Sequence, residues 1–521
     1  MKTTNIVIGV LVAAGAVWGG STWYIGQQSK GQIDQSIRNV NDFLAQASPY
    51  IRLSEVSYEK GFLSSTGIYK LNIDIPDLPE ELANITFLNK VYHGPLPLIQ
   101  EGRFTPALAI SKTTLINNDN TKKLFEAANG QEPFTSSSIL SFAKEIENTI
   151  KTATLKFVDT NGEITVEPMQ ALTHTNLDYA FINTEATGGA IKAKGKSTAS
   201  LSVDGFQLSN KTTRTANKNY VGDSALKFGK FNIVDPAQTI LIDNIDMTAR
   251  TTESPNGLLN GDVTYSVNKI NVNKIDFGTT SMKMLFNNVD MKAVNDFSRA
   301  TANLNLASAS PEEEAALDKE FENLFFKLAD AKFEFHIDPL NIKGTTGEAL
   351  LNFGVVFNGE KASSASRNSI ELFATQALRK ANLSFSIDDN LIKEFGSGIM
   401  QVTEGADKAT ADAEAQVISG MAGMIAEQSG MAIYKDGKTT SSVSYDADQP
   451  EGSQIDFNGK KMGLNEFAMT ASSLLGLTGS SAAPALLNEE ELFQALENDT
   501  VEEPAEQMNE PVEEAKQQKA E

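Results

Sequence analysis

The chain has 521 residues, of which 40% are hydrophobic and 21% are charged, so it can bury the cores of two or three ordinary domains. Its formal net charge of -23 disfavours binding to nucleic acid, and it disfavours adhesion to anionic lipid through a basic patch. The chain has no cysteine, which excludes disulfides, thiolate metal sites and cysteine nucleophiles.

An uncharged apolar segment lies near the amino terminus, at residues 6–26. About 20 apolar residues suffice to span a hydrocarbon core, and Trp23 and Tyr24 suit its far interface. A small-residue triplet at 14–16 makes a cleaved signal peptide the rival interpretation, but the apolar run continues beyond it. We expect an uncleaved transmembrane anchor, with the short tail of residues 1–5 in the cytoplasm and the body outside it.

Residues 27–52 are expected to form a juxtamembrane helix and a linker, because apolar residues recur there at helical spacing. The stripe consists of Ile33, Ile37, Val40, Leu44 and Ala47. A helix with one apolar stripe packs against the body of the protein or against a second copy, so a homo-oligomer is an open alternative.

Residues 53–309 are expected to form long antiparallel strands in a meander, because the period of the apolar residues changes from 3.6 to 2. One such strand carries alternating apolar residues at Val263, Tyr265 and Val267. Around Gly229, and again after Val272, the alternation is displaced by an extra residue, which indicates bulges. Asn161-Gly162 lies between two alternating runs and predicts a hairpin turn.

Three hexapeptides in this region resemble one another, with apolar residues at their first, fourth and sixth positions. They are VDGFQL (203–208), IDNIDM (242–247) and FNNVDM (286–291). Such short matches are weak evidence of duplication, but they support a regular antiparallel meander.

Residues 310–475 are expected to form an α+β region. Ser310, Pro311 and Glu313 predict a capped start for a helix over 311–328 that covers part of the sheet. Further segments have strand or helix patterns, or turn residues. The strands are expected at 333–337 and 350–357, the helices near 368–380 and 388–430, and the turns at Asp436-Gly437 and Asn458-Gly459.

Within the last of these helices, residues 417–426 are uncharged and rich in methionine and glycine. Methionine at helical spacing usually packs in a core, and a surface that faces lipid or a partner is the alternative. The acidic segment at residues 476–521 is expected to be disordered, since its last 33 residues contain 12 acidic and 2 basic side chains.

Strict alternation leaves one sheet face apolar, and this face requires a second sheet, helices or a hydrophobic ligand to cover it. We expect protein to cover it and keep a hydrophobic-ligand face as the alternative. The residues of that candidate face are Val263, Tyr265, Val267, Phe321 and Phe325.

We find no catalytic or metal-binding motif, and the three histidines are far apart in the sequence. His93 is followed by Gly94 and Pro95, and prolines restrict the backbone before them. The residue types around His93 therefore indicate a structural corner of the backbone rather than acid–base chemistry. We expect no enzyme activity, no metal and no cofactor.

Three segments resemble the YdgA-like (YdgA/YihF) proteins, a family of unknown function from the envelopes of Gram-negative bacteria. They are YEKGFLSS (58–65), YHGPLPL (92–98) and IDFNGKKMGLNEF (455–467). The family-motif residues, for which we expect a structural role, are Tyr58, Gly61, Phe62, Tyr92, His93, Gly94, Pro95, Asn458, Gly459 and Lys460. The resemblance implies an inner-membrane anchor and a periplasmic body, and it implies no activity.

The sequence therefore predicts a β-rich α+β fold with long, bulged antiparallel strands in a meander, covering helices and one transmembrane helix. The function that we expect is that of a non-enzymatic structural or interaction protein of the cell envelope. A carrier or groove for a lipid or another hydrophobic ligand is the alternative. Its partners would be the inner membrane, an envelope protein or a lipid, and not nucleic acid.

Overall fold

The computed structural model describes most of the chain between residues 51 and 474. The described residues are 51–73, 83–94, 96–99, 102, 104, 106–160, 162–196, 199–301 and 310–474, with Ile37 and Asn41. The chain divides after Leu464 into two compact units, and the sheet described below lies in the first.

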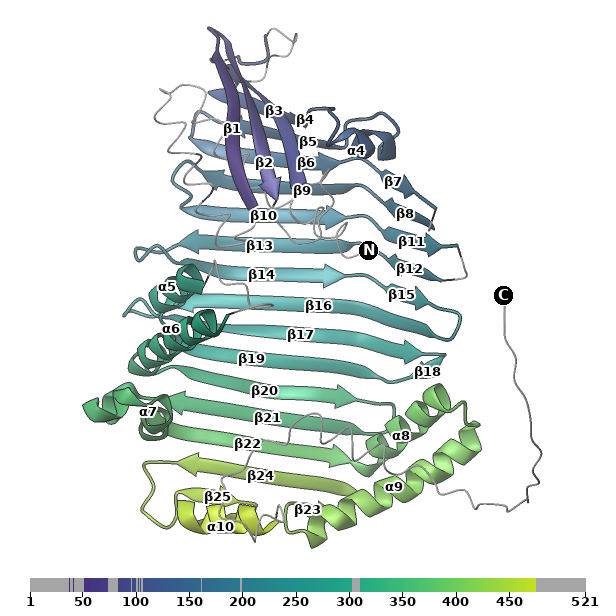
Figure 1. Ribbon diagram of the computed structural model, residues 1–521, viewed down its shortest axis with the longest axis vertical. Helices are drawn as coiled ribbons and strands as arrows, with labels where there is room; N and C mark the ends of the chain where they lie inside the picture. Colours follow the sequence, from purple (N-terminus) through teal and green to yellow (C-terminus); the bar gives the residue numbers. More distant parts are fainter. Residues whose placement is uncertain are drawn as a thin grey trace, which may run out of the picture. The chain divides into compact units, whose positions relative to one another are not determined.

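Twenty-six strands form one antiparallel sheet, so the β-rich expectation is confirmed. The first strands are β1 (Ile51–Lys60), β2 (Ser64–Ile73), β3 (Asn84–His93), β4 (Ala109–Leu115), β5 (Phe134–Leu140) and β6 (Glu145–Thr152). Each of these strands pairs with the next in the chain, as a meander does. Figure 1 shows β1 to β3 crossing the face of the strands that follow.

This crossing buries the main hydrophobic core. Leu71 on β2 is 1% exposed and Ile85 on β3 is 0% exposed. They pack with Phe134 of β5 and Ile150 of β6 from the facing part of the sheet, and with the short helix α4 (Lys122–Ala127). Ile37 packs against the same core, while the Asn41 side chain bonds both backbone groups of Leu53. Ile37 and Asn41 of the segment 27–52 thus contact the body of the protein.

The next strands are interrupted by two-residue breaks that line up from strand to strand. They are β7 (Leu155–Val158), β8 (Gly162–Val166), β9 (Met169–Asn176), β10 (Phe181–Gly188), β11 (Ile191–Gly195), β12 (Ser200–Val203), β13 (Phe206–Arg214), β14 (Tyr220–Phe228), β15 (Phe231–Val234) and β16 (Thr239–Glu253). We call this line of breaks the crease. It comprises the breaks at residues 153–154, 167–168, 189–190, 204–205 and 229–230, and it continues at residues 243–244, where β16 itself is unbroken.

Pairing continues across the crease without a change of register. β13 pairs with β14 on one side of it, and β12 pairs with β15 in the same alignment on the other. Asp204 N–H donates to the Lys230 carbonyl at 2.9 Å, and Gly229 N–H donates to the Gly205 carbonyl at 3.0 Å. All strands therefore bend together, so the displaced alternation around Gly229 comes from this shared bend and not from the expected bulge.

The three similar hexapeptides mark positions where the backbone leaves the extended conformation. The third residue of each has a positive φ: 87° at Gly205, 51° at Asn244 and 59° at Asn288. Gly205 and Asn244 lie at the crease, and Asn288 lies beside a register shift between β17 (Leu259–Val272) and β19 (Thr279–Val289). Glycine and asparagine adopt this conformation at the lowest cost, so the similarity of the segments reflects backbone geometry.

The displaced alternation after Val272 has a different cause from the one we expected. Asn273 and Lys274 both have positive φ and form a tight turn between β17 and β18 (Ile275–Asp276). The expectation of a bulge at this position was wrong, because the chain reverses direction there.

The sheet continues into the carboxy-terminal half, where β19 pairs with β20. The strands there are β20 (Glu334–Lys343), β21 (Glu348–Phe357), β22 (Leu378–Asp388), β23 (Ile433–Lys435), β24 (Lys438–Asp446), β25 (Ile455–Phe457) and β26 (Lys460–Met462). The turns at Asp436-Gly437 and Asn458-Gly459 join paired strands, as expected. β7 pairs with β8, which begins at Gly162 of the expected Asn161-Gly162 turn.

Helices lie at two margins of the sheet in Figure 1. On one side are α5 (Met291–Thr301), α6 (Pro311–Asp330) and α7 (Ile370–Ala377), with short 3-10 turns at Gly359–Lys361 and Ser364–Asn368. On the other side are α8 (Asp389–Thr403) and α9 (Lys408–Gln428). The last described helix is α10 (Leu464–Leu474).

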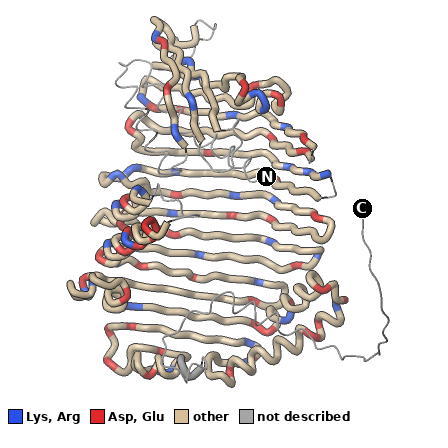
Figure 2. The backbone as a smooth tube through the Cα atoms, viewed as in Figure 1, with Lys and Arg blue, Asp and Glu red and all other residues tan. Residues whose placement is uncertain are grey.

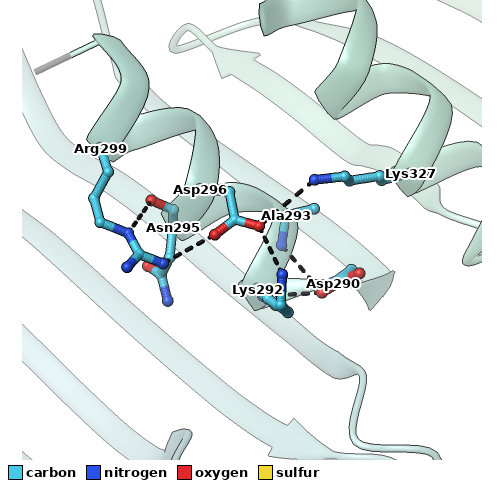
Figure 3. Close-up of polar contacts among 7 residues, drawn as sticks. All are labelled: Asp290, Lys292, Ala293, Asn295, Asp296, Arg299 and Lys327. Atoms are coloured by element: carbon cyan, nitrogen blue, oxygen red, sulfur yellow. Dashed lines mark hydrogen bonds and ion pairs between the residues drawn. The ribbon is translucent and has the colours of Figure 1, made fainter.

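Helix α6 begins with the expected capping box, since Ser310 and Glu313 bond each other's backbone. Figure 3 shows how α5 is held to it, because Asp296 pairs with Lys292 and Arg299 of α5 and with Lys327 of α6. Phe325 packs against Phe357 and Phe373 at the end of β21. The expected cover is therefore confined to one margin of the sheet.

Helix α8 is fixed at the opposite margin. The Phe395 ring stacks on the Phe277 ring at 5.6 Å between centroids. The Glu394 carboxylate accepts hydrogen bonds from the backbone and hydroxyl groups of Thr345 and Thr346 in the β20–β21 turn. Burial opposes ionisation of Glu394, but these hydrogen bonds outweigh it and lower its pKa.

The expected transmembrane segment at 6–26 and the acidic segment at 476–521 lie outside the described residues. Among the described residues, no helix is both long and apolar enough to cross a membrane.

Candidate hydrophobic-ligand face

One face of the sheet is apolar across the crease and beyond it. In an antiparallel pair, residues opposite each other point to the same side, so the pairing register assigns every side chain to a face. We call this side of strands β10 to β22 the apolar face. In the middle of the sheet its members include Phe206, Leu208, Leu226, Phe228, Phe231, Ile233, Ile240, Ile242, Ile245, Met247, Val263, Tyr265, Val267, Met282 and Met284.

Burial of this face changes along the sheet. Of the strand residues from β12 to β20, all of which are described, only Leu259 is buried. On three separate strands the apolar face carries side chains that are more than a third exposed: Ile233 at 37%, Tyr265 at 38% and Leu383 at 43%. The face is thus packed in the amino-terminal core and half-exposed in the middle of the sheet, between the helices at its margins.

The structure places the predicted ligand-face residues in two separate groups. Val263, Tyr265 and Val267 share the apolar face on β17, as expected. Phe325 lies at the sheet margin in the cluster with Phe373, while Phe321 is 54% exposed on α6. The two phenylalanines therefore differ in their surroundings, on a helix that the Lys327–Asp296 pair holds alongside α5.

A row of polar side chains also crosses this side of the sheet, and sequence reasoning missed it. In β3 to β6 the row contains Asn89, Ser111, Thr113, Ser136, Ser138 and Asn148, all of which are buried. It continues through Thr173 and Thr184 to Asn210 and Ser224, where the Ser224 hydroxyl donates to the Asn210 side chain at 2.8 Å. Polar residues at apolar positions of the alternation were its signal in the sequence.

Two of the family motifs lie side by side. Tyr92 is opposite Ser64 in the pair β2–β3, and His93 N–H donates to the Leu63 carbonyl at 2.9 Å. Tyr58 lies on β1 opposite Gly67, and Gly61 turns the chain between β1 and β2. The third motif, with Asn458, Gly459 and Lys460, forms the separate β25–β26 turn.

Backbone geometry explains several residues of these motifs. Gly94 has a φ of 99°, and a Cβ on Gly61 would lie 2.4 Å from the Ser64 carbonyl oxygen. Tyr92 is buried against Leu98 in a small core, whereas Phe62 is 97% exposed. Pro95 lies outside the described residues.

His93 has one polar partner on the neighbouring strand. Its Nε2 lies 2.9 Å from the Ser65 hydroxyl oxygen, while its Nδ1 is buried without a hydrogen-bond partner. Burial, and then the nearby Lys60, lowers the pKa of His93, so the ring is neutral at neutral pH. A neutral ring with no carboxylate bonded to its Nδ1 matches a packed structural histidine better than an oriented general base.

The third motif also holds backbone groups. The Asn458 side chain accepts from Ser442 N–H at 2.8 Å and donates to the Met431 carbonyl at 3.2 Å. Within the described part of the chain, no group of three or more His, Asp or Glu side chains could hold a metal ion. Figure 2 shows Lys and Arg interspersed with Asp and Glu along the described strands and helices, rather than gathered together.

The chain is similar to bacterial proteins along most of its length. It is 22% identical to Protein YdgA of Escherichia coli (strain K12) over 510 residues, which cover 93% of this chain and 100% of that protein. It is 26% identical to the uncharacterized protein YihF of the same strain over 490 residues, which cover 89% and 98% of the two chains. A shorter match, 28% over 139 residues, relates 26% of this chain to 37% of an uncharacterized Haemophilus influenzae protein.

No solved structure matches the chain. The family described as "Bacterial protein of unknown function (DUF945)" matches residues 1–465, which include the whole sheet, the first two motifs and all but the last two residues of the third. The chain therefore belongs to this family of bacterial proteins of unknown function.

Proposed function

We propose that the protein is a non-enzymatic component of the bacterial cell envelope whose apolar face binds the acyl chains of a lipid or another hydrophobic ligand. In this proposal residues 6–26 anchor it in the inner membrane and its body lies in the periplasm. The observation that carries the proposal is the half-exposed apolar face between the two margins where helices lie.

Apolar surface that is exposed to water carries a cost in free energy. Monomeric soluble proteins rarely expose contiguous apolar patches larger than a few hundred Å², and larger patches mark interaction sites. Here apolar side chains lie opposite one another on neighbouring strands from Phe206 on β13 to Met284 on β19. The amino-terminal core is closely packed beside Phe134 and Met169, where a cavity has a volume of only about 10 Å³.

A comparison of the two sheet faces tests the proposal. We would replace Ile233, Tyr265 and Leu383 together by serine in the full chain and measure co-purified lipid by mass spectrometry. These side chains are already more than a third exposed, so their loss costs little stability while it removes apolar contact surface. The expected result is a clear fall in the lipid-to-protein ratio.

The matched control replaces the neighbours Asn232, Thr264 and Asn382 by serine, because these residues lie on the opposite face of the same strands. The control should retain the lipid content of the unchanged protein, including lipid held by the anchor. Equal lipid content in both variants would contradict a ligand on the apolar face.

A structural or protein-binding envelope component is the second candidate. Packing of the apolar side chains against one another favours this candidate, since the protein alone already buries most side chains of the apolar face in part. This candidate predicts that the serine variants change binding of a protein partner and leave lipid content unchanged.

The proposed location has its own test. A reporter fused after residue 521 should be active in the periplasm and inactive in the cytoplasm. A mature chain that begins near residue 17 would instead indicate a cleaved signal peptide.

A further inference from the structure

Helix α9 has two apolar faces with different side-chain sizes. Small residues, namely Ala411, Ala415, Ser419 and Gly423, form its buried face. There the Gly396 backbone of α8 approaches Ala415, and the Tyr434 ring lies against Gly423. These small side chains let the neighbouring elements approach closely, so this face is already occupied.

The opposite face carries large apolar side chains that stand in solvent. It consists of Val417, Ile418, Met421, Met424 and Ile425, which we call the α9 stripe. These side chains are between 44% and 64% exposed. They follow at helical spacing over more than two turns, with no charged residue between positions 415 and 426. An apolar ridge of this size on a helix that already packs on its other side indicates a docking surface.

The charges around the stripe restrict what can cover it. Exposed Glu414 and Glu427 flank the stripe, while Lys408 is paired with Asp412 at 2.7 Å. Carboxylates at both ends oppose an anionic surface, and the chain's net charge of -23 opposes close approach of a second copy. A neutral apolar environment avoids both of these repulsions. The flexible methionine side chains can also adapt to a fluid environment.

We propose that the α9 stripe docks into the surface of a zwitterionic phospholipid bilayer, with its large side chains at the level of the upper acyl chains. A ridge on a helix fits this position, because interfacial helices bury one apolar face just below the headgroups. A helical protein partner would require a groove, whereas the stripe projects from the side of α9 opposite to α8.

This inference rests on the proposed function and adds the membrane surface as the source of the hydrophobic ligand. Helix α9 packs on α8, and Phe395 of α8 stacks on Phe277 beside β18. The stripe is thus connected, through two packed helices, to one margin of the apolar face. Docking there holds the bilayer at the same margin of the sheet, with α8 and α9 between the bilayer and the apolar face.

A single introduced cysteine tests the docking, since the chain has none of its own. We would label Met424→Cys with a fluorophore and reconstitute the full chain into phosphatidylcholine vesicles that contain brominated acyl chains. The matched control carries the same fluorophore on Val158→Cys. Val158 is suitable because its side chain is 68% exposed on β7. The expected result is at least about threefold more quenching at position 424 than at position 158.

Two further variants keep the test specific. Adding Met421→Glu and Ile425→Glu to the labelled chain should reduce quenching to the level of position 158. Adding Met421→Leu and Ile425→Leu should preserve it. Quenching at position 424 that equals the control value, as a protein-covered or water-facing stripe would give, overturns the proposal. Self-quenching that rises with the protein-to-lipid ratio in unbrominated vesicles would assign the stripe to a second copy and also overturn it.

The lipid-to-protein ratio of the Ile233, Tyr265 and Leu383 variant remains an independent measurement. If that ratio does not fall while the label at position 424 is quenched, the proposed function fails and the docking of α9 stands. If the ratio falls while the label at position 424 is not quenched, the proposed function stands and the docking of α9 is contradicted.

Discussion

Two of the crease positions contain a residue with positive φ, namely Gly205 and Asn244. Gly205 sits at the crease with a φ of 87°, and a Cβ on it would lie 2.2 Å from the Gly188 carbonyl oxygen. The same close approach occurs at Gly188, where an added Cβ would meet the Phe206 ring at 2.1 Å. The crease therefore depends on glycine for both backbone conformation and space.

Replacing Gly205 by alanine should lower the free energy of unfolding by about 2–4 kcal/mol, because both a left-handed backbone and a backbone clash must be accommodated. Denaturant titration of the full chain measures this change. Gly405→Ala is the matched control, since Gly405 has a φ of 68° with nothing within 4 Å of the added Cβ. Its expected cost is about 1 kcal/mol. Equal costs at the two positions would show that the crease tolerates a side chain.

We expect the stability of the protein to depend on pH through His93. The direction of this dependence follows from the lowered pKa of His93. The unfolded chain takes up a proton near the ordinary value of 6.5, whereas the folded chain does so only at a lower pH. Stability should therefore be complete above about pH 6.5 and fall as pH decreases through the folded pKa. Thermal unfolding between pH 5 and 7 should show a smaller pH slope for His93→Asn. An identical slope in both proteins would mean that His93 titrates freely in the folded state.

At the scale of elements, helix α6 shows why residue types alone predicted a helix but not its position relative to the other elements. Its capping box and amphipathic pattern predicted the helix correctly, with the start at Pro311. The pattern could not show that Asp296 and Lys327 bring it alongside α5. Phe321 and Phe325 look alike in the sequence, yet only Phe325 contacts other aromatic rings.

Truncation of these two phenylalanines should therefore give different results. Phe325→Ala should lower the free energy of unfolding by about 3–5 kcal/mol, because it removes ring contacts with Phe357 and Phe373. Phe321→Ala should change it by no more than about 0.5 kcal/mol, since Phe321 is largely exposed. Parallel thermal melts provide the comparison. A large loss from Phe321→Ala would place this side chain against other protein and would contradict the half-open sheet.

Sequence reasoning succeeded where a signal is local. The hairpin turns at Asp436-Gly437 and Asn458-Gly459 and the alternating strand at Val263 depend on neighbouring residues only. The displaced alternation at Gly229 was interpreted as a bulge, whereas the strands bend there together without a register shift, which depends on pairing between many strands. The polar row through Asn148 and Asn210 is likewise visible only when the register is known.

At the scale of the molecule, one sheet has two kinds of environment. From β1 to β6 its apolar side faces other strands of the same sheet, and Leu71, Ile85 and Ile150 are buried there. From β12 to β20 the same side has only partly buried side chains, apart from Leu259. Backbone pairing is continuous between the two, so the difference lies in what covers the apolar side. Local stability should differ accordingly, because packed apolar contacts contribute most of the stability of a sheet.

Amide hydrogen exchange of the full chain, read by mass spectrometry, should resolve this difference. Peptides from β2 to β6 should exchange slowly, because opening them exposes a buried core. Peptides from β13 to β19 should exchange faster, although their strands are paired on both sides. Addition of phosphatidylcholine should slow exchange in β13 to β19 and leave β2 to β6 unchanged, since a ligand that binds only the folded face stabilises what it covers. Uniform protection along the sheet before lipid is added would mean that the apolar face is already covered by protein, and the proposed ligand would then have no surface to bind.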